Sequence, residues 1–106
     1  MIKTIPTVGD HLYTYTPCTS YYVRACRDPW TVIEPKGNTC IIQEAELVFY
    51  GPRYFNTLPD LIRENPNGRT MKLRWSERNQ RWQESPNPGY PRVAVFGKWD
   101  YFPYLD

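Results

Sequence analysis

Proline recurs along the whole chain, 11 times in 106 residues, and this spacing is the strongest constraint on the fold. A proline removes a backbone donor and disrupts a helix interior, so repeated prolines favour short extended segments over long helices. Aromatic residues make up 16% of the chain, with 9 tyrosines, and they favour a pleated, half-buried surface. A chain of this length supplies one hydrophobic core. We therefore expect a single mainly β domain over residues 1–106.

A first β-hairpin is predicted in the N-terminal half. Residues 30–34 are β-branched and aromatic, Pro35-Lys36-Gly37 is a three-residue loop with glycine last, and residues 38–43 return. Pairing across this loop sets Val32 opposite Cys40. Cys40 is therefore interpreted as a core residue.

A second β-hairpin is predicted around a two-residue turn, Arg78-Asn79. Residues 70–75 alternate strictly between two faces, with Met71, Leu73 and Trp75 on one of them. The turn sets Trp75 opposite Trp82. Further extended segments are expected at about residues 8–15, 21–26, 47–50 and 92–96.

One short helix is expected near residues 58–65. Thr57 followed by Pro59 and Asp60 is typical of a helix start, with a threonine cap, an early proline and an acid three residues on. Pro66 disfavours helical geometry at Asn65, so the helix ends there.

Metal and covalent chemistry lack their usual residue sets. Cys18, Cys26 and Cys40 match no zinc spacing, and His11 is the only histidine. We interpret the cysteines as reduced packing residues, with metal or redox use as the alternative. Nucleophilic catalysis by His11 with Cys18 or Cys26 is a further alternative.

Two carboxylates and one turn are further candidates for chemistry. Glu44 and Glu46 lie on one face of a strand, as an acid-base pair requires, but a solvated strand edge explains them equally well. Residues 66–69 form a turn and not a phosphate-binding loop before a helix. We predict that the chain is not an enzyme and uses no cofactor or metal.

No apolar run approaches the length that spans a bilayer, and residues 1–10 lack the apolar block of a secretory signal. The expected location is the cytoplasm, with no membrane partner.

Basic residues are concentrated in the second half of a chain whose net charge is +2. Between Arg63 and Lys98, eight basic side chains face three acidic ones. Those on or near the second hairpin are the candidate binding residues: Lys72, Arg74, Arg78, Arg81 and Arg92. Nucleic-acid or nucleotide binding combines such charges with base stacking, for which Trp75 and Trp82 are the candidates. The interpretation we favour places both tryptophans in the core and leaves a basic strip on the surface.

The C-terminal segment is rich in aromatic residues. Trp99, Tyr101, Phe102 and Tyr104 follow Gly97 closely. They either close the barrel over an open end, which we favour, or form an exposed anchor for a protein partner, and Trp99, Tyr101 and Tyr104 are candidate binding residues on that account. An aromatic cage for a cationic ligand is a further alternative, although no residue set singles it out.

The first 44 residues resemble the opening of SH3-like barrels. The resemblance rests on Val8-Gly9-Asp10, on Thr31-Val32-Ile33-Glu34, on a glycine turn and on Thr39-Cys40-Ile41-Ile42-Gln43. In those folds the Gly-Asp pair marks the first strand and the central hairpin forms most of the barrel wall. The resemblance implies a small SH3-like or related β-barrel.

A second resemblance covers most of the chain. Val8-Gly9-Asp10 and Thr31-Val32-Ile33-Glu34 are followed by Pro66-Asn67-Gly68-Arg69, Leu73-Arg74-Trp75-Ser76 and Arg81-Trp82-Gln83. This set is similar to small uncharacterised proteins encoded by bacteriophages and other mobile elements, although residues 46–65 are longer and more aromatic than in that set. The resemblance implies a phage origin and carries no site residue over. The expected function is non-catalytic binding of a host protein, such as a defence component that it inhibits, and nucleic-acid or nucleotide binding is the alternative.

Overall fold

The computed structural model of the chain describes residues 3–15, 28–52, 59–87, 89 and 91–99. Its strands are β1 (His11–Tyr15), β2 (Asp28–Lys36), β3 (Thr39–Glu44), β4 (Glu46–Val48), β5 (Leu61–Arg63), β6 (Thr70–Ser76), β7 (Arg81–Glu84) and β8 (Val93–Phe96). No helix is present among these described residues. The mainly β fold expected from the sequence is confirmed.

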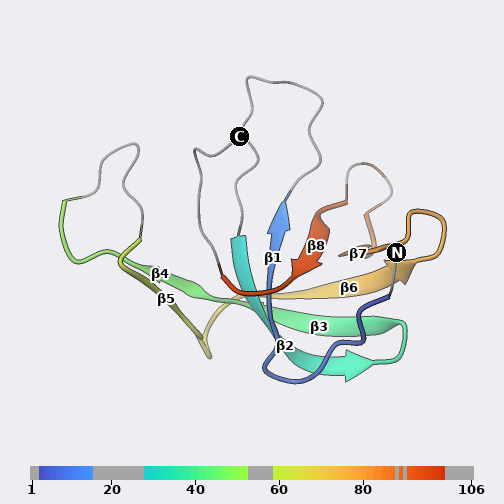
Figure 1. The fold of residues 1–106 in the computed structure, drawn as a ribbon, viewed down its shortest axis with the longest axis horizontal. Helices are drawn as coiled ribbons and strands as arrows, with labels where there is room; N and C mark the ends of the chain where they lie inside the picture. The colour runs from blue at the N-terminus through green and yellow to red at the C-terminus, as the bar shows by residue number, and fades with distance from the viewer. Residues whose placement is uncertain (1–2, 16–27, 53–58, 88, 90, 100–106) are drawn as a thin grey trace.

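Six of these strands form a closed barrel in the order β1-β2-β3-β6-β7-β8 (Figure 1). Each neighbouring pair is antiparallel. The barrel closes where β8 pairs with β1, with Leu12 opposite Phe96 and Tyr15 opposite Val93. Closure leaves none of these six strands at a free sheet edge. This is the small β-barrel architecture expected for an SH3-like fold.

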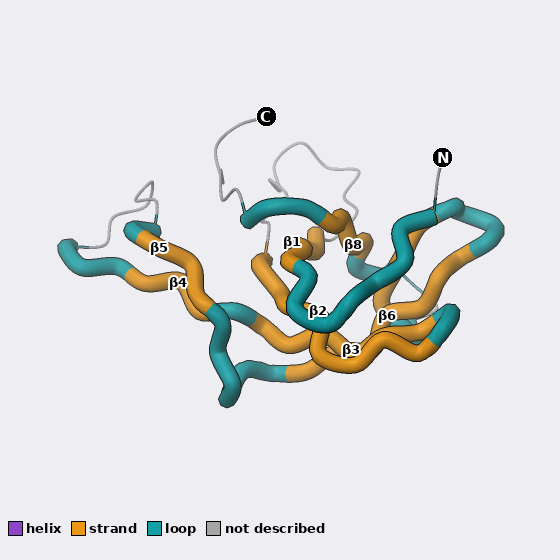
Figure 2. Tube along the Cα trace, turned by 60° about the horizontal axis from the view of Figure 1, so that its bottom comes forward, coloured by secondary structure: helices purple, strands orange, loops and turns teal. Residues whose placement is uncertain are grey.

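β4 and β5 form a separate two-stranded sheet, which projects from the barrel as an arm (Figures 1 and 2). Leu47 lies opposite Ile62, and Glu46 opposite Arg63. The helix predicted near residues 58–65 is therefore wrong, because residues 61–63 pair as a strand with residues 46–48.

Asp60 gives the physical reason for this difference. The carboxylate that the sequence suggested as part of a helix cap accepts a hydrogen bond from the Tyr50 backbone N–H at 2.7 Å. The Asp60 N–H donates to the Val48 carbonyl at 2.8 Å. The segment between Pro59 and Pro66 is too short to satisfy many backbone groups within a helix, and pairing with β4 satisfies them instead. Thr57, the expected cap, lies outside the described residues.

The first hairpin forms between the predicted segments, but its register differs. Val32 lies opposite Ile42 rather than Cys40, and Lys36 pairs with Thr39 across the two residues Gly37 and Asn38. Gly37 has a φ of +63°, as the first central position of a type II′ turn requires, and this moves the turn one residue onward. Ile33 is an extra residue in β2, where the pairing shifts between Val32 and Glu34.

The second hairpin has the predicted pairing with a longer turn. Trp75 lies opposite Trp82, and Arg74 opposite Gln83. β6 ends at Ser76 and β7 begins at Arg81, so residues 77–80 make the connection instead of the expected two-residue turn. The alternation of residues 70–75 thus identified both the strand and its buried face.

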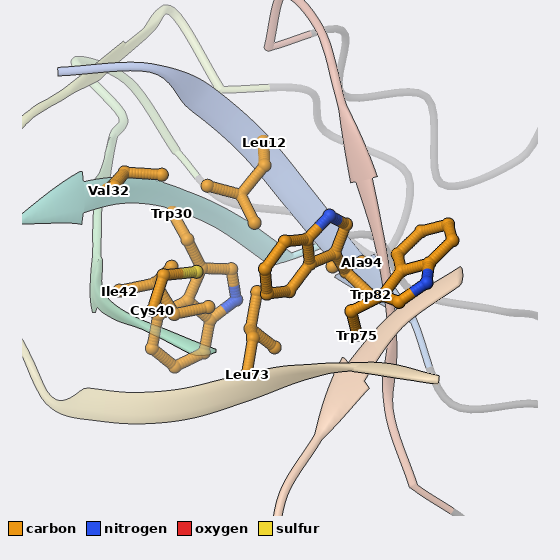
Figure 3. Packing of buried hydrophobic residues seen from close by; sticks show 9 residues of the cluster. All are labelled: Leu12, Trp30, Val32, Cys40, Ile42, Leu73, Trp75, Trp82 and Ala94. Carbon is orange, nitrogen blue, oxygen red and sulfur yellow. The ribbon is translucent and has the colours of Figure 1, made fainter. Parts of the chain in front are cut away.

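The barrel interior is filled by side chains that alternate inward along the strands (Figure 3). Nine buried residues make up this cluster: Leu12, Trp30, Val32, Cys40, Ile42, Leu73, Trp75, Trp82 and Ala94. Cys40 is 1% exposed, so its interpretation as a core residue is confirmed, although it lies opposite Pro35. Cys18 and Cys26 lie outside the described residues.

Residues 3–10 lead into β1 as an extended strap. Gly9 has a φ of +90°, a conformation that favours glycine, and the Asp10 carboxylate accepts a hydrogen bond from the Thr7 N–H at 2.8 Å. The Gly9 N–H also donates to the Val32 carbonyl at 2.9 Å, which joins the strap to β2.

Candidate interaction surface

The outer face of β6 and β7 is basic. Because side chains alternate along a strand, the burial of Met71, Leu73 and Trp75 directs Lys72 and Arg74 to the outside. On β7, Arg81 lies opposite Ser76 and therefore shares this outer side. Arg78 lies in the connection between the two strands. We call the set Lys72, Arg74, Arg78 and Arg81 the basic face.

The charges of the basic face are free of carboxylate partners within the described part of the chain. The ion pairs found there use other cations: Lys36 with Glu34, Arg63 with Glu46, Arg69 with Glu44, and Arg92 with Asp28. Lys72, Arg74 and Arg78 are exposed. Arg81 is half-buried, and its Nε donates to the Gln83 Oε1 at 3.0 Å. Unneutralised positive charge is thus carried on β6 and on the turn that follows it.

A shallow groove of about 510 Å³ lies beside this face, lined by Arg74, Ser76, Gln83 and residues 84–87. Arg74 belongs to both features. The groove lies between the outer side of β6 and β7 and the loop that follows β7. Residues 83–87 were not among the predicted binding residues, because only the fold brings the loop after β7 beside Arg74.

Arg92 was predicted to belong with the basic residues, but its charge is directed elsewhere. Its guanidinium lies 3.8 Å from the Asp28 carboxylate at the start of β2. Burial raises the pKa of Asp28, and Arg92 partly offsets that rise. The Arg92 backbone N–H also donates to the Glu84 carboxylate at 3.2 Å. Arg92 therefore links elements of the barrel and is not a free cation.

Trp99 packs against the barrel wall. Its indole Nε1 donates to the backbone carbonyls of Leu12 at 3.1 Å and Trp30 at 3.0 Å. Its ring stacks on His11 with centroids 3.6 Å apart and planes 4° apart. These contacts agree with the closure interpretation rather than with an exposed anchor. Tyr101 and Tyr104 lie outside the described residues.

Trp75 and Trp82 are 7% and 2% exposed, so they offer no platform on which bases could stack. Their rings meet edge to face, with centroids 5.9 Å apart. The sequence interpretation that placed both in the core is confirmed. The two tryptophans of β6 and β7 therefore cannot supply the exposed aromatic rings on which the bases of a nucleic acid stack.

The residues weighed for catalysis have other partners. His11 stacks on Trp99, Glu44 pairs with Arg69, and Glu46 pairs with Arg63. Burial raises the pKa of the Cys40 thiol to about 11, which suppresses the thiolate that a nucleophile needs. Within the described ranges, no group of three or more His, Cys, Asp or Glu side chains is arranged to hold a metal ion.

Comparisons with protein-family models, with curated proteins and with solved structures found no match to this chain. Among the described residues, none forms a helix long and apolar enough to cross a membrane.

Proposed function

We propose that this chain is a non-catalytic binding protein that uses the basic face to bind an acidic surface of a partner protein. The observation that carries the proposal is the group of exposed cations on β6 and the following turn, which have no ion pair within the described residues. Such a group attracts and orients an acidic partner. The adjoining groove offers space for a protruding side chain of that partner.

The sequence resemblance to phage-encoded proteins guides the choice of partner. We propose a protein of the bacterial host, encountered in the host cytoplasm, with a defence component that the chain inhibits as the first candidate. Nucleic acid is the second candidate, because phosphates also attract unpaired cations. Burial of Trp75 and Trp82 favours the protein, since single-stranded binding draws much of its affinity from stacking on exposed aromatic rings.

The test is charge reversal on the basic face. A Lys72→Glu/Arg74→Glu variant should lose a host protein that the tagged wild-type chain retains from a nuclease-treated bacterial lysate. Lys98→Glu, which changes an exposed lysine after β8, should retain it. All three substituted residues are exposed, so both variants should unfold at nearly the wild-type temperature.

Two outcomes contradict the proposal. One is retention of the same host proteins by the charge-reversed variant. The other is binding of DNA or RNA with a steep salt dependence, which identifies the nucleic-acid alternative: roughly 0.7–0.9 decades of affinity are lost per decade of salt for each neutralised phosphate.

A further inference from the structure

The N-terminal strap places a cation between two tryptophans at one end of the barrel. The Lys3 Nζ lies 5.5 Å from the ring centroid of Trp75 and 5.7 Å from that of Trp82. Both distances are within the range of about 6 Å over which an aromatic face attracts a cation. The two rings meet at an interplanar angle of 64°, so they form a corner that offers the ammonium two aromatic faces.

Polar groups around the corner complete a site for an ammonium group. Lys3 donates a hydrogen bond to the Asn38 side-chain oxygen in the turn between β2 and β3. The Trp75 indole N–H donates to the Glu77 carboxylate at 3.0 Å, which adds electron density to the ring that faces the cation. The Trp82 indole N–H donates to the Thr4 carbonyl at 2.9 Å. The surroundings of Lys3 are therefore those that stabilise a positive charge.

The strap is held to this end of the barrel by few contacts. Lys3 and Thr4 attach it through the two hydrogen bonds to Asn38 and Trp82. Of the apolar side chains of the strap, Pro6 is buried, whereas Ile5 is 81% exposed and Val8 is 65% exposed. A segment that buries one of its three apolar side chains opens at a lower free-energy cost than the barrel strands. Lys3 can thus be displaced while the barrel remains folded.

Space for a larger ligand adjoins the corner. A cavity of about 370 Å³ borders Thr4, Trp75, Trp82 and Phe96, with Asn79 and Arg81 at its polar side. An N-methylated ammonium is bulkier than the lysine ammonium and would extend from the corner into this cavity.

We propose that Trp75, Trp82 and Asn38 form a binding site for an alkylammonium group, and that Lys3 occupies this site in cis and closes it. The lysine side chain of a partner and a small quaternary ammonium compound present the same chemistry. Of the basic face, only Arg81 borders the cavity beside this site, and the proposal does not depend on the function proposed for that face. With Lys3 in place both rings are almost fully buried, so a ligand gains access only when the strap moves.

The test compares the wild-type chain with Lys3→Ala, using NMR spectra that resolve the tryptophan indole N–H signals. Tetramethylammonium chloride and N-acetyl-lysine amide are titrated separately, with sodium chloride at equal ionic strength as the reference. Lys3→Ala should bind at least one of the two probes 10-fold or more tightly than the wild type does, with shifts concentrated at Trp75 and Trp82. The preferred probe identifies the source of the ammonium group.

Two further variants keep the proposal falsifiable. Lys98→Ala removes an exposed lysine elsewhere on the protein and should bind both probes with the wild-type affinity. Trp75→Phe in the Lys3→Ala background keeps an aromatic core residue with a weaker cation attraction, and should reduce probe affinity at least 3-fold. Equal affinities of wild type and Lys3→Ala, shifts spread evenly over the indoles, or no effect of Trp75→Phe each overturn the proposal.

Discussion

A hydrogen bond closed to solvent joins Trp30 of β2 to Thr14 of β1 inside the barrel. The Trp30 Nε1 donates to the Thr14 Oγ1 at 2.8 Å. Thr14 is 0% exposed and Trp30 is 1% exposed, so water cannot replace either partner. Thr14→Val exchanges the hydroxyl for a methyl group of similar size. The substitution therefore leaves the packing intact and the indole N–H without an acceptor.

The expected cost follows from this geometry. A buried donor that loses its acceptor costs about 1–3 kcal/mol, and the isosteric methyl opens no cavity. We therefore expect Thr14→Val to lower the free energy of unfolding by about 2 kcal/mol. For a domain of this size that corresponds to a melting temperature about 10 °C lower. The matched control is Thr14→Ser, which keeps the oxygen and removes one methyl group, at a cost of about 1 kcal/mol.

Urea denaturation followed by tryptophan fluorescence measures both variants against the wild type. The order of stability should be wild type, Thr14→Ser and then Thr14→Val, with similar dependence on urea concentration in all three. If Thr14→Val is as stable as Thr14→Ser or more stable, the hydrogen bond to Trp30 does not stabilise the barrel and the reasoning is refuted.

Other contacts give predictions that can be measured with the same purified protein. Trp99→Phe removes the indole donor that binds two backbone carbonyls and should lower the free energy of unfolding by about 1–3 kcal/mol. An unchanged midpoint of urea denaturation would contradict this prediction. Cys40 should resist iodoacetamide at pH 8 in the folded protein, because raising its pKa from 9.0 to about 11 lowers the thiolate fraction roughly 100-fold. Mass spectrometry of the peptide that contains Cys40 measures the alkylation, and rapid alkylation of the folded protein refutes this prediction. Since the unfolded chain ionises Cys40 first, the stability linked to this thiol is complete below pH 9 and is lost as the pH rises toward 11. Gly68→Ala should destabilise by about 2 kcal/mol or more, because a Cβ at this position meets the Glu44 carbonyl oxygen, whereas Gly51→Ala, whose Cβ meets nothing within 4 Å, should melt near the wild-type temperature.

The second hairpin could be predicted from the sequence because one of its faces is buried. Met71, Leu73 and Trp75 must all point inward, and a slip of one residue would expose all three. The expected turn, residues 78 and 79, and the observed connection, residues 77–80, have the same centre, so both set Trp75 opposite Trp82. The error in turn length, two residues expected and four observed, therefore left the pairing unchanged.

The first hairpin and the arm show where local patterns stop being informative. The extra residue Ile33 in β2 shifts the register, and no local pattern distinguishes it from its β-branched neighbours. Asp60 has the same sequence context whether it caps a helix or closes a hairpin. The choice is made by pairing with β4, a tertiary contact that propensity does not report.

The candidate sites were predictable to different degrees, because some of them follow from a local sequence pattern and others depend on tertiary contacts. Lys72 and Arg74 follow from strand alternation, so the sequence located them correctly on an outer face. Lys3 contacts Trp75 and Trp82, and Trp99 contacts Trp30. The partners are more than 65 positions apart along the chain, and no spacing within the sequence indicates such contacts. Asn38 reaches Lys3 because the β2–β3 turn lies one residue further along than predicted.

β6 contributes residues both to the core and to the basic face, so a change in its register alters both proposed sites. The alternation that buries Trp75 also exposes Lys72 and Arg74, so the register that forms the aromatic corner forms the basic face as well. A substitution that disturbs the register of β6 must affect both sites together. Lys3→Ala and Lys72→Glu/Arg74→Glu lie outside the β6–β7 core contacts, and each should therefore change one site while the other keeps its wild-type behaviour. A change in both host-protein retention and probe affinity in either variant would mean that the two surfaces are a single site.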